Sequence, residues 1–168
     1  GNISGIYRMP HREHVMVDIS GAALSHASRR TRNHPGRHVT FTGDNQRFMA
    51  DHLQRYQGRI TLVDMDPYGS VGPQTQAFFQ HYPVDRSMVV SLTDGSVCDW
   101  RNVGVRDFYR HYLSRKERPS PSDMPEMLDN MMEKLGEKHG FTAHKINSAW
   151  KENKHAYYTS YLVKPAAA

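Results

Sequence analysis

Four consecutive residues, Asp66-Pro67-Tyr68-Gly69, follow a strongly hydrophobic segment and combine a carboxylate, a rigid backbone and an aromatic ring. An aromatic amine is a weak nucleophile because its lone pair is delocalised, and hydrogen bonds from its NH2 group to fixed acceptors localise that pair. The Asp66 carboxylate and the Pro67 carbonyl could be those acceptors, and Tyr68 offers a face on which a flipped-out base can stack. A plain Asp-Pro turn explains the tetrapeptide equally well.

Two further polar groups follow hydrophobic segments earlier in the chain. Asp18 ends a β-branched run and could accept hydrogen bonds from the two hydroxyls of a ribose, although a helix-capping role fits it as well. Asp44 and Asn45 could hold the exocyclic amine of an adenine, and turn chemistry explains them equally. In open α/β sheets ligands bind at the carboxyl ends of the strands. We therefore expect Asp18, Asp44 and Asp66 to lie on one shared rim.

The segments that carry these residues alternate between strand-like and helical patterns. Ser20 is the expected cap of a helix that continues to about residue 31. The patterns predict strands at 15–18, 39–42, 60–65 and 87–92, and helices at 46–56, 70–81 and 105–113. Repeated β-α units require crossover helices, so we predict a doubly wound α/β fold, a mostly parallel sheet with helices on both faces.

The last third of the chain has a different pattern. Residues 93–102 read as a polar surface loop containing Asp94, Asp99 and Trp100, and the Pro/Ser-rich stretch 119–125 as irregular. A helix is predicted at 127–138 and an antiparallel pair of strands at 141–146 and 157–163. We expect one domain over residues 1–165, with 166–168 as a frayed tail.

The order and spacing of these motifs resemble the tRNA guanine-N2 dimethyltransferase family of class I S-adenosylmethionine-dependent methyltransferases. The segments that carry the resemblance are Val17-Asp18-Ile19-Ser20, Gly43-Asp44-Asn45 and residues 62–70, and the opening Ser4-Gly5-Ile6-Tyr7-Arg8 resembles the end of that family's cofactor loop. The resemblance implies an S-adenosylmethionine site and an RNA substrate, of which tRNA is one candidate. Its implied cofactor residues are Ser4, Gly5, Asp18, Ile19, Asp44 and Asn45, with Asp66, Pro67 and Tyr68 at the target amine.

The sequence departs from that family in three places. After Ser70 it continues Val71-Gly72-Pro73-Gln74, where the family has a proline and then an apolar helix start. It lacks the family's large carboxyl-terminal RNA-binding domain. It also begins inside the cofactor loop, so the first, central strand of the family's sheet is apparently missing from the N-terminus. Without this strand, backbone N–H and C=O groups on its two neighbours would be unpaired, which costs free energy. We therefore expect residues upstream of Gly1 to supply it. The alternatives are residues 2–7 or another segment.

Composition narrows the alternatives. The 168 residues contain 22 Lys and Arg against 17 Asp and Glu, which favours a polyanionic partner only modestly. A single cysteine, Cys98, and the lack of a long apolar run fit a soluble cytoplasmic protein. His11 and His14 are not accompanied by a second group of residues at the spacing of metal ligands, so no metal is expected. No G-x-G-x-x-G motif follows a predicted strand, which argues against a nicotinamide-dependent protein.

Two hypotheses from different classes follow. The first is an S-adenosylmethionine-dependent N-methyltransferase acting on an exocyclic amine of a nucleobase, guanine N2 in RNA above all. The second is a non-catalytic methyltransferase-like module that holds a protein or nucleic-acid partner, for which the incomplete cofactor loop is the main support. Neither hypothesis specifies an oligomeric state.

Overall fold

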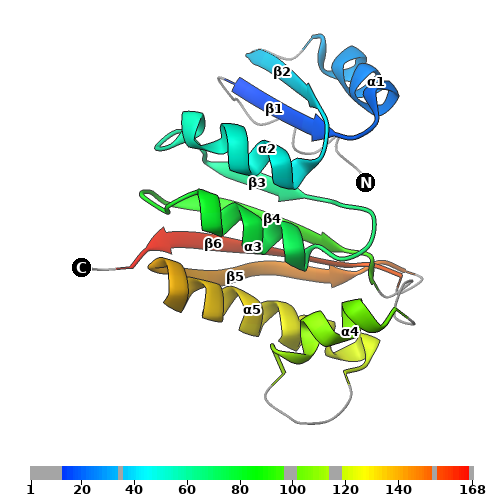
Figure 1. The fold of residues 1–168 in the computed structure, drawn as a ribbon, viewed down its shortest axis with the longest axis vertical. Coiled ribbons are helices and arrows are strands. Elements are labelled where there is room, and N and C mark those ends of the chain that lie inside the picture. Colours follow the sequence, from blue (N-terminus) through cyan, green and yellow to red (C-terminus); the bar gives the residue numbers. More distant parts are fainter. Residues whose placement is uncertain (1–12, 34–35, 97–101, 114–118, 153–154, 167–168) are drawn as a thin grey trace. The chain divides into compact units, whose positions relative to one another are not determined.

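A computed structural model describes residues 13–33, 36–96, 102–113, 119–152 and 155–166 of the chain. The chain divides into two compact units, residues 1–53 and 54–168, whose elements are labelled in Figure 1. The expected single domain over residues 1–165 stays a prediction.

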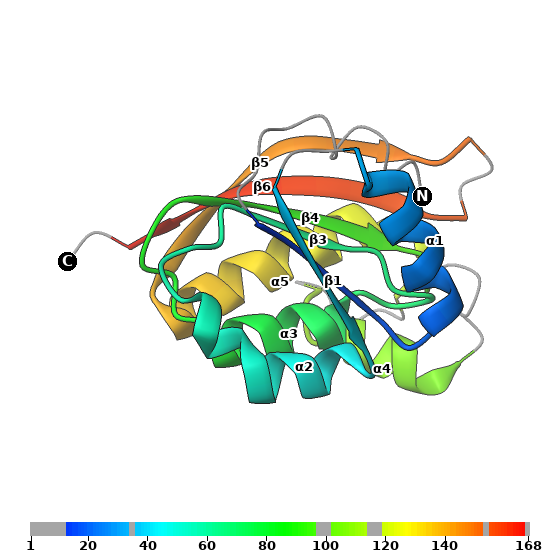
Figure 2. The ribbon, with the colours of Figure 1, turned by 90° about the horizontal axis from the view of Figure 1, so that it is seen from above.

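The first unit is a two-stranded parallel sheet with two helices. Its elements are β1 (Glu13–Asp18), α1 (Gly21–Thr31), β2 (Arg37–Thr42) and α2 (Asn45–His52), and the 3-10 turn η2 (Leu53–Tyr56) follows α2 along the chain. β1 and β2 pair in parallel with Asp18 opposite Thr42, so both strands end at the same edge. Parallel neighbours need a crossover connection, which α1 provides. In Figure 2, α1 and α2 lie on opposite faces of this pair of strands.

Short polar side chains fix where both helices of the first unit begin. Ser20 caps α1 by accepting a hydrogen bond from the backbone N–H of Ala23 at 3.2 Å, as the sequence predicted. Asp44 caps α2 in the same way, accepting from the N–H of Arg47 at 3.0 Å. The buried apolar side chains of these elements are Met16, Leu24, Phe48, Met49 and Leu53.

The second unit is a four-stranded sheet with strand order β3-β4-β6-β5. Its elements are β3 (Leu62–Met65), α3 (Gly72–His81), β4 (Met88–Asp94), α4 (Val103–Arg110), the 3-10 turn η4 (Pro121–Asp123), α5 (Met124–His139), β5 (Phe141–Trp150) and β6 (Tyr157–Pro165). β3 and β4 are parallel, whereas β6 is antiparallel to both β4 and β5. The predicted antiparallel pair at the end of the chain is therefore confirmed.

The core of the second unit lies between the sheet and its helices. α3 and α5 cover the same face of the sheet (Figure 2). Alternate residues of β4 and β6 are buried, as expected when one face of a strand packs on helices. α5 contributes its apolar stripe, made by Met124, Met127, Leu128, Met131, Met132 and Leu135.

One predicted irregular stretch is partly regular. Residues 119–125 contain the turn η4 and the start of α5 at Met124. Ser120 and Asp123 form a capping box, in which the backbone N–H of Ser120 donates to Asp123 Oδ2 at 2.8 Å. Pro125 is compatible with this helix because the first turn needs no N–H donor there. The expectation of wholly irregular backbone is wrong for this reason.

The pairing of the strands leaves one edge of β1 and one edge of β3 without a described neighbour. Among the described residues, β1 pairs only with β2 and β3 pairs only with β4. Each therefore has one edge without a described strand beside it. Residues 1–12 lie outside the described part of the chain. The origin of a central strand stays a prediction.

β5 forms the opposite edge of the second unit's sheet. Its pairing with β6 shifts register between Lys145 and Asn147, which is a bulge in the strand, and Ile146 beside the shift is 57% exposed. Within the described ranges, none of the helices combines the length and the apolar character that crossing a bilayer requires.

Gly136 tests how tightly α5 packs against the strand that follows it. A Cβ atom at this position would lie 2.5 Å from the backbone oxygen of Phe141. Alanine in an unobstructed helix is about 1 kcal/mol more favourable than glycine. Here we expect the opposite: Gly136→Ala should lower the free energy of unfolding by about 1 to 3 kcal/mol, because the backbone at Phe141 must move to admit the methyl group. Urea unfolding of this variant and of Glu137→Ala, an exposed neighbour, measures the difference; a stabilised Gly136→Ala protein would contradict the packing.

Candidate functional site

The loop after β3 presents a carboxylate and an aromatic ring to solvent. Asp66 directly follows buried Met65, and its exposed carboxylate makes no hydrogen bond or ion pair with the described residues. Tyr68 is fully exposed at 100% relative accessibility. An aromatic side chain held entirely in water buries none of its apolar surface, so this ring is available to stack on a ligand.

The carboxylate of a buried residue, Asp94, anchors this loop through hydrogen bonds. Asp94, the last residue of β4, has no exposed surface. Its Oδ2 accepts hydrogen bonds from the backbone N–H of Val71 at 3.0 Å and from the hydroxyl of Tyr109. Its Oδ1 accepts from the backbone N–H of Ser96 at 2.9 Å and from that residue's hydroxyl. Four donors therefore satisfy a charge that would otherwise be costly to bury.

Two further hydrogen bonds connect the loop to the same centre. The backbone N–H of Gly95 donates to the carbonyl of Gly69 at 2.9 Å. The hydroxyl of Ser70 donates to Tyr109 Oη at 3.0 Å. The last residues of the connection between Asp66 and α3, Gly69 to Val71, are thus attached to the end of β4 and to α4.

The surroundings of Tyr109 keep its hydroxyl protonated, so that it remains a hydrogen-bond donor to Asp94. Burial raises the pKa of the Tyr109 phenol well above its usual value, and the charge of Asp94 raises it further. The phenol therefore stays protonated throughout the ordinary pH range and continues to donate to Asp94. Helix α4 approaches closely because Gly72 has no side chain: a Cβ atom there would lie 2.1 Å from Phe108 Cε1.

A second carboxylate lies beside Asp66. Asp64 lies in β3 and Asp66 directly follows the strand, near enough for its charge to act on Asp64. Although part of Asp64 reaches solvent, its pKa is raised, first by desolvation and then by the negative charge of Asp66. The end of β3 thus carries two neighbouring acids.

The first unit brings its own predicted residues together. The backbone N–H of Gly43 donates to the carbonyl of Asp18 at 3.0 Å, which places Asp18 next to the Gly43-Asp44-Asn45 turn. Asp18 Oδ1 accepts from the N–H of Ser20 at 2.7 Å, and its Oδ2 has no hydrogen bond with the described residues. Ile19 beside it is 80% exposed. Asn45 is the first residue of α2.

The structure separates the predicted residues into three groups. Asp18, Ile19, Asp44 and Asn45 meet in the first unit, and Asp66, Pro67 and Tyr68 follow one another in the second. Ser4 and Gly5 lie outside the described residues, as do Asp99 and Trp100. A rim shared by Asp18, Asp44 and Asp66 stays a prediction.

Sequence reasoning missed the centre around Asp94. We expected Asp94 to belong to a surface loop, and this is wrong because β4 extends to it and its carboxylate is buried by Val71, Ser96 and Tyr109. A usable signal was present, since Asp94 ends an apolar strand just as Asp18 does.

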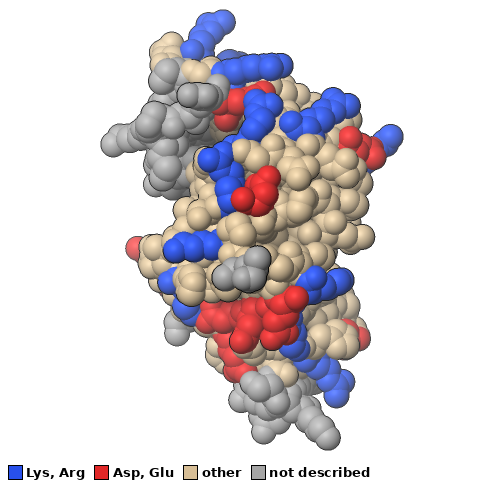
Figure 3. All heavy atoms as spheres, turned by 90° about the vertical axis from the view of Figure 1, so that its left-hand side faces the viewer, with Lys and Arg blue, Asp and Glu red and all other residues tan. Residues whose placement is uncertain are grey.

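Charge is mixed on the surface. Figure 3 shows Lys and Arg side chains dispersed over one face, with one large group of Asp and Glu side chains and several smaller acidic patches among them. The modest net positive charge therefore does not form a single broad basic patch on this face. Within the described ranges, no three or more His, Cys, Asp or Glu residues are grouped as metal ligands would be.

Comparison with known proteins gives a structural match and no sequence match. No protein-family model and no curated protein matches the chain. Trm1 from Pyrococcus horikoshii, solved in complex with S-adenosyl-L-methionine, superposes with a TM-score of 0.68 over 95% of the chain at 18% identity. The chain has a methyltransferase fold. It spans 46% of the length of that Trm1 structure.

A second solved structure is more distant. The methyltransferase domain of bacterial CtHen1-C has a TM-score of 0.48 and 14% identity, covering 91% of this chain and 77% of its own. The predicted fold class, a mostly parallel α/β sheet with an antiparallel hairpin at the end, is confirmed by the topology and by the Trm1 match.

Asp94→Asn tests whether the buried carboxylate holds the loop. Asparagine replaces one acceptor oxygen by an NH2 group, which would then face a donor in a buried site. We expect the free energy of unfolding to fall by at least about 1 to 3 kcal/mol, because the cost of an unsatisfied buried group is larger when a charged acceptor is lost. Urea unfolding measures it, with Asp107→Asn on the exposed surface of α4 as the control. Equal stability of the two variants would show that Asp94 is not the anchor.

Proposed function

We propose that the chain is an S-adenosylmethionine-dependent N-methyltransferase that acts on an exocyclic amine of a nucleobase, specifically guanine N2 in RNA, with tRNA as the first substrate to test. The methyltransferase fold supports the general chemistry, and Trm1, the similar solved protein, was determined with S-adenosyl-L-methionine. The specific substrate rests on the resemblance of residues 62–70 to the guanine-N2 family.

The observation that carries this proposal is the combination of a free carboxylate and a free ring on an anchored loop. Asp66 has no hydrogen-bonding partner among the described residues, and Tyr68 is fully exposed. The hydrogen bonds of Asp94 and Gly95 hold the backbone between them and α3. Preorganised acceptors are effective in catalysis because they need not reorganise during the reaction.

The proposed roles follow from donor and acceptor chemistry. Asp66 and the carbonyl of Pro67 accept the two N–H bonds of the amine, which localises the nitrogen lone pair and directs it away from the ring plane. The lone pair then forms the new C–N bond to the methyl group as the C–S electron pair returns to sulfur. The amine nitrogen loses one proton, which the Asp66 carboxylate takes in this proposal. Tyr68 stacks on the base and fixes its plane.

The first unit fits the nucleoside part of the cofactor. Asp18 Oδ2 has no described hydrogen bond, so the carboxylate can accept one from a ribose hydroxyl. Asp44 uses Oδ1 to cap α2, which leaves its second oxygen for an adenine amine, and exposed Ile19 offers an apolar surface for the adenine ring. When bound, S-adenosylmethionine supplies an electrophilic methyl group on a sulfonium. The proposal requires this group and the target amine to meet.

Asp66→Asn tests the role of the carboxylate in methyl transfer. The substitution keeps size and one acceptor but removes the charge that withdraws the amine proton. We expect binding of S-adenosylmethionine to change less than twofold and methyl transfer to guanine-containing RNA to fall by about 100-fold or more, a typical contribution of one preorganised electrostatic group. Radiolabelled methyl transfer measures this, with Asp107→Asn as the matched control. Full activity of Asp66→Asn would exclude the role assigned to Asp66.

Asp18→Asn tests the cofactor site separately. Asparagine keeps the oxygen that accepts from Ser20, so the start of α1 is preserved. We expect affinity for S-adenosylmethionine to fall by about tenfold or more, because hydrogen bonds to charged groups contribute about 1.5 to 3 kcal/mol. Isothermal titration calorimetry measures it, with Asp51→Asn as the control. No detectable heat with the unaltered chain would instead favour a non-catalytic binding module.

A further inference from the structure

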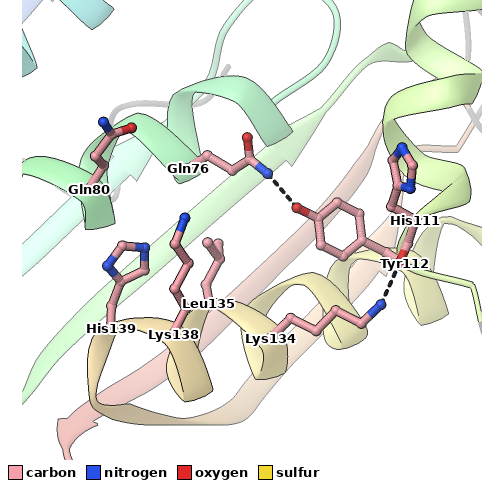
Figure 4. A pocket seen from close by; sticks show the side chains of 8 residues that line it. All are labelled: Gln76, Gln80, His111, Tyr112, Lys134, Leu135, Lys138 and His139. Atoms are coloured by element: carbon pink, nitrogen blue, oxygen red, sulfur yellow. Dashed lines mark hydrogen bonds between the residues drawn. The ribbon is translucent and has the colours of Figure 1, made fainter.

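A polar pocket of about 450 Å³ lies on the helical face of the second unit (Figure 4). It is bounded by α3, by the end of α4 and by the last two turns of α5. Its lining residues are Gln76, Gln80, His111, Tyr112, Lys134, Leu135, Lys138 and His139. Among the described residues that line it, none is acidic and only Leu135 is aliphatic.

The charge of the pocket comes from two lysines on one side of α5. Lys134 and Lys138 are four residues apart and share a helix face, whereas Glu133 and Glu137 are each offset by one residue, about 100° around the helix. Lys134 donates to the carbonyl of His111, and its ammonium group lies 5.5 Å from the centre of the Tyr112 ring. Lys138 has no hydrogen bond or ion pair with the described residues.

The other polar groups of the pocket are suited to donate. Gln76 donates to the hydroxyl of Tyr112, which orders that side of the pocket. Desolvation, with a further effect from the charge of Lys138, lowers the pKa of His139. His139 is therefore neutral at neutral pH and can donate one N–H, while the positive charge comes from the lysines.

We propose that this pocket binds a backbone phosphate of the RNA. A phosphodiester is a compact anion with several acceptor oxygens, and it matches a group of lysine, amide and imidazole donors. The inference deepens the proposed function and rests on it for the identity of the polyanion.

The position of the pocket fits a phosphate that flanks the modified base. Tyr109 supports the Asp66 loop, and Tyr112 lines the pocket less than one helical turn further along the same segment. Gln76 likewise follows Gly72, at the start of α3, by about one turn. The anchor of the loop and the wall of the pocket are thus built from the same two segments.

The test measures RNA binding and its salt dependence. A fluorescein-labelled RNA hairpin with an unpaired guanine is titrated with the unaltered chain, Lys138→Gln and Lys164→Gln, each at several salt concentrations, by fluorescence anisotropy. Lys164 is an exposed lysine at the end of β6 that does not line the pocket. We expect Lys138→Gln to weaken binding severalfold and to reduce the slope of log K against log salt by about 1. Lys138→Arg should retain both.

Several outcomes overturn the inference. One is equal affinity and slope for Lys138→Gln and Lys164→Gln, and another is no binding of the hairpin by the unaltered chain. A third is saturable, Lys138-dependent binding of inorganic phosphate alone, followed by NMR of the His139 ring, without any effect of Lys138→Gln on RNA affinity. This last result would assign the pocket to a small phosphate compound.

The same measurements separate this inference from the proposed function. RNA binding that depends on Lys138 but is not followed by methyl transfer would retain the pocket and reject the enzyme. Methyl transfer with an unchanged KM for RNA in Lys138→Gln would retain the enzyme and reject the pocket.

Discussion

The buried carboxylate of Asp94 is the constraint on which the geometry of the Asp66 loop depends. A charge with no exposed surface must be satisfied by donors, and these come from the loop itself, from Ser96 and from α4. Because the donors belong to three segments, the carboxylate fixes the end of β4, the start of α3 and the approach of α4 together. The exposed residues of the loop can then have defined positions without being buried.

Much of the fold follows from local signals. Ser20 caps α1 and the helix ends at Thr31 as its pattern predicted, and the hairpin of β5 and β6 was readable because no helical pattern intervenes. The alternation of strands and helices gave the fold class, which depends on the order of elements and tolerates errors of a few residues at their ends. The candidate acids were found because strand ends in such folds are where ligands bind.

What sequence reasoning missed depends on contacts between distant residues. The burial of Asp94 is set by Val71, 23 positions before it, and by Tyr109, 15 positions after it. Nothing in the residues next to Asp94 distinguishes it from an exposed acid at a strand end. The pocket beside Lys138 likewise needs side chains from α3, from α5 and from the residues that follow α4, so its lining could not be predicted from any one of these segments.

The register shift in β5 also has a consequence for how copies of this protein behave at high concentration. A regular edge strand presents an even row of backbone donors and acceptors that another chain can extend, which is a common start of aggregation. Between Lys145 and Asn147 the bulge interrupts the regular spacing of these backbone groups. The ammonium group of Lys145, beside the bulge, forms an ion pair with Asp129. The irregularity therefore protects the sheet from growing through its outer edge, a protection that a straightened β5 would lose.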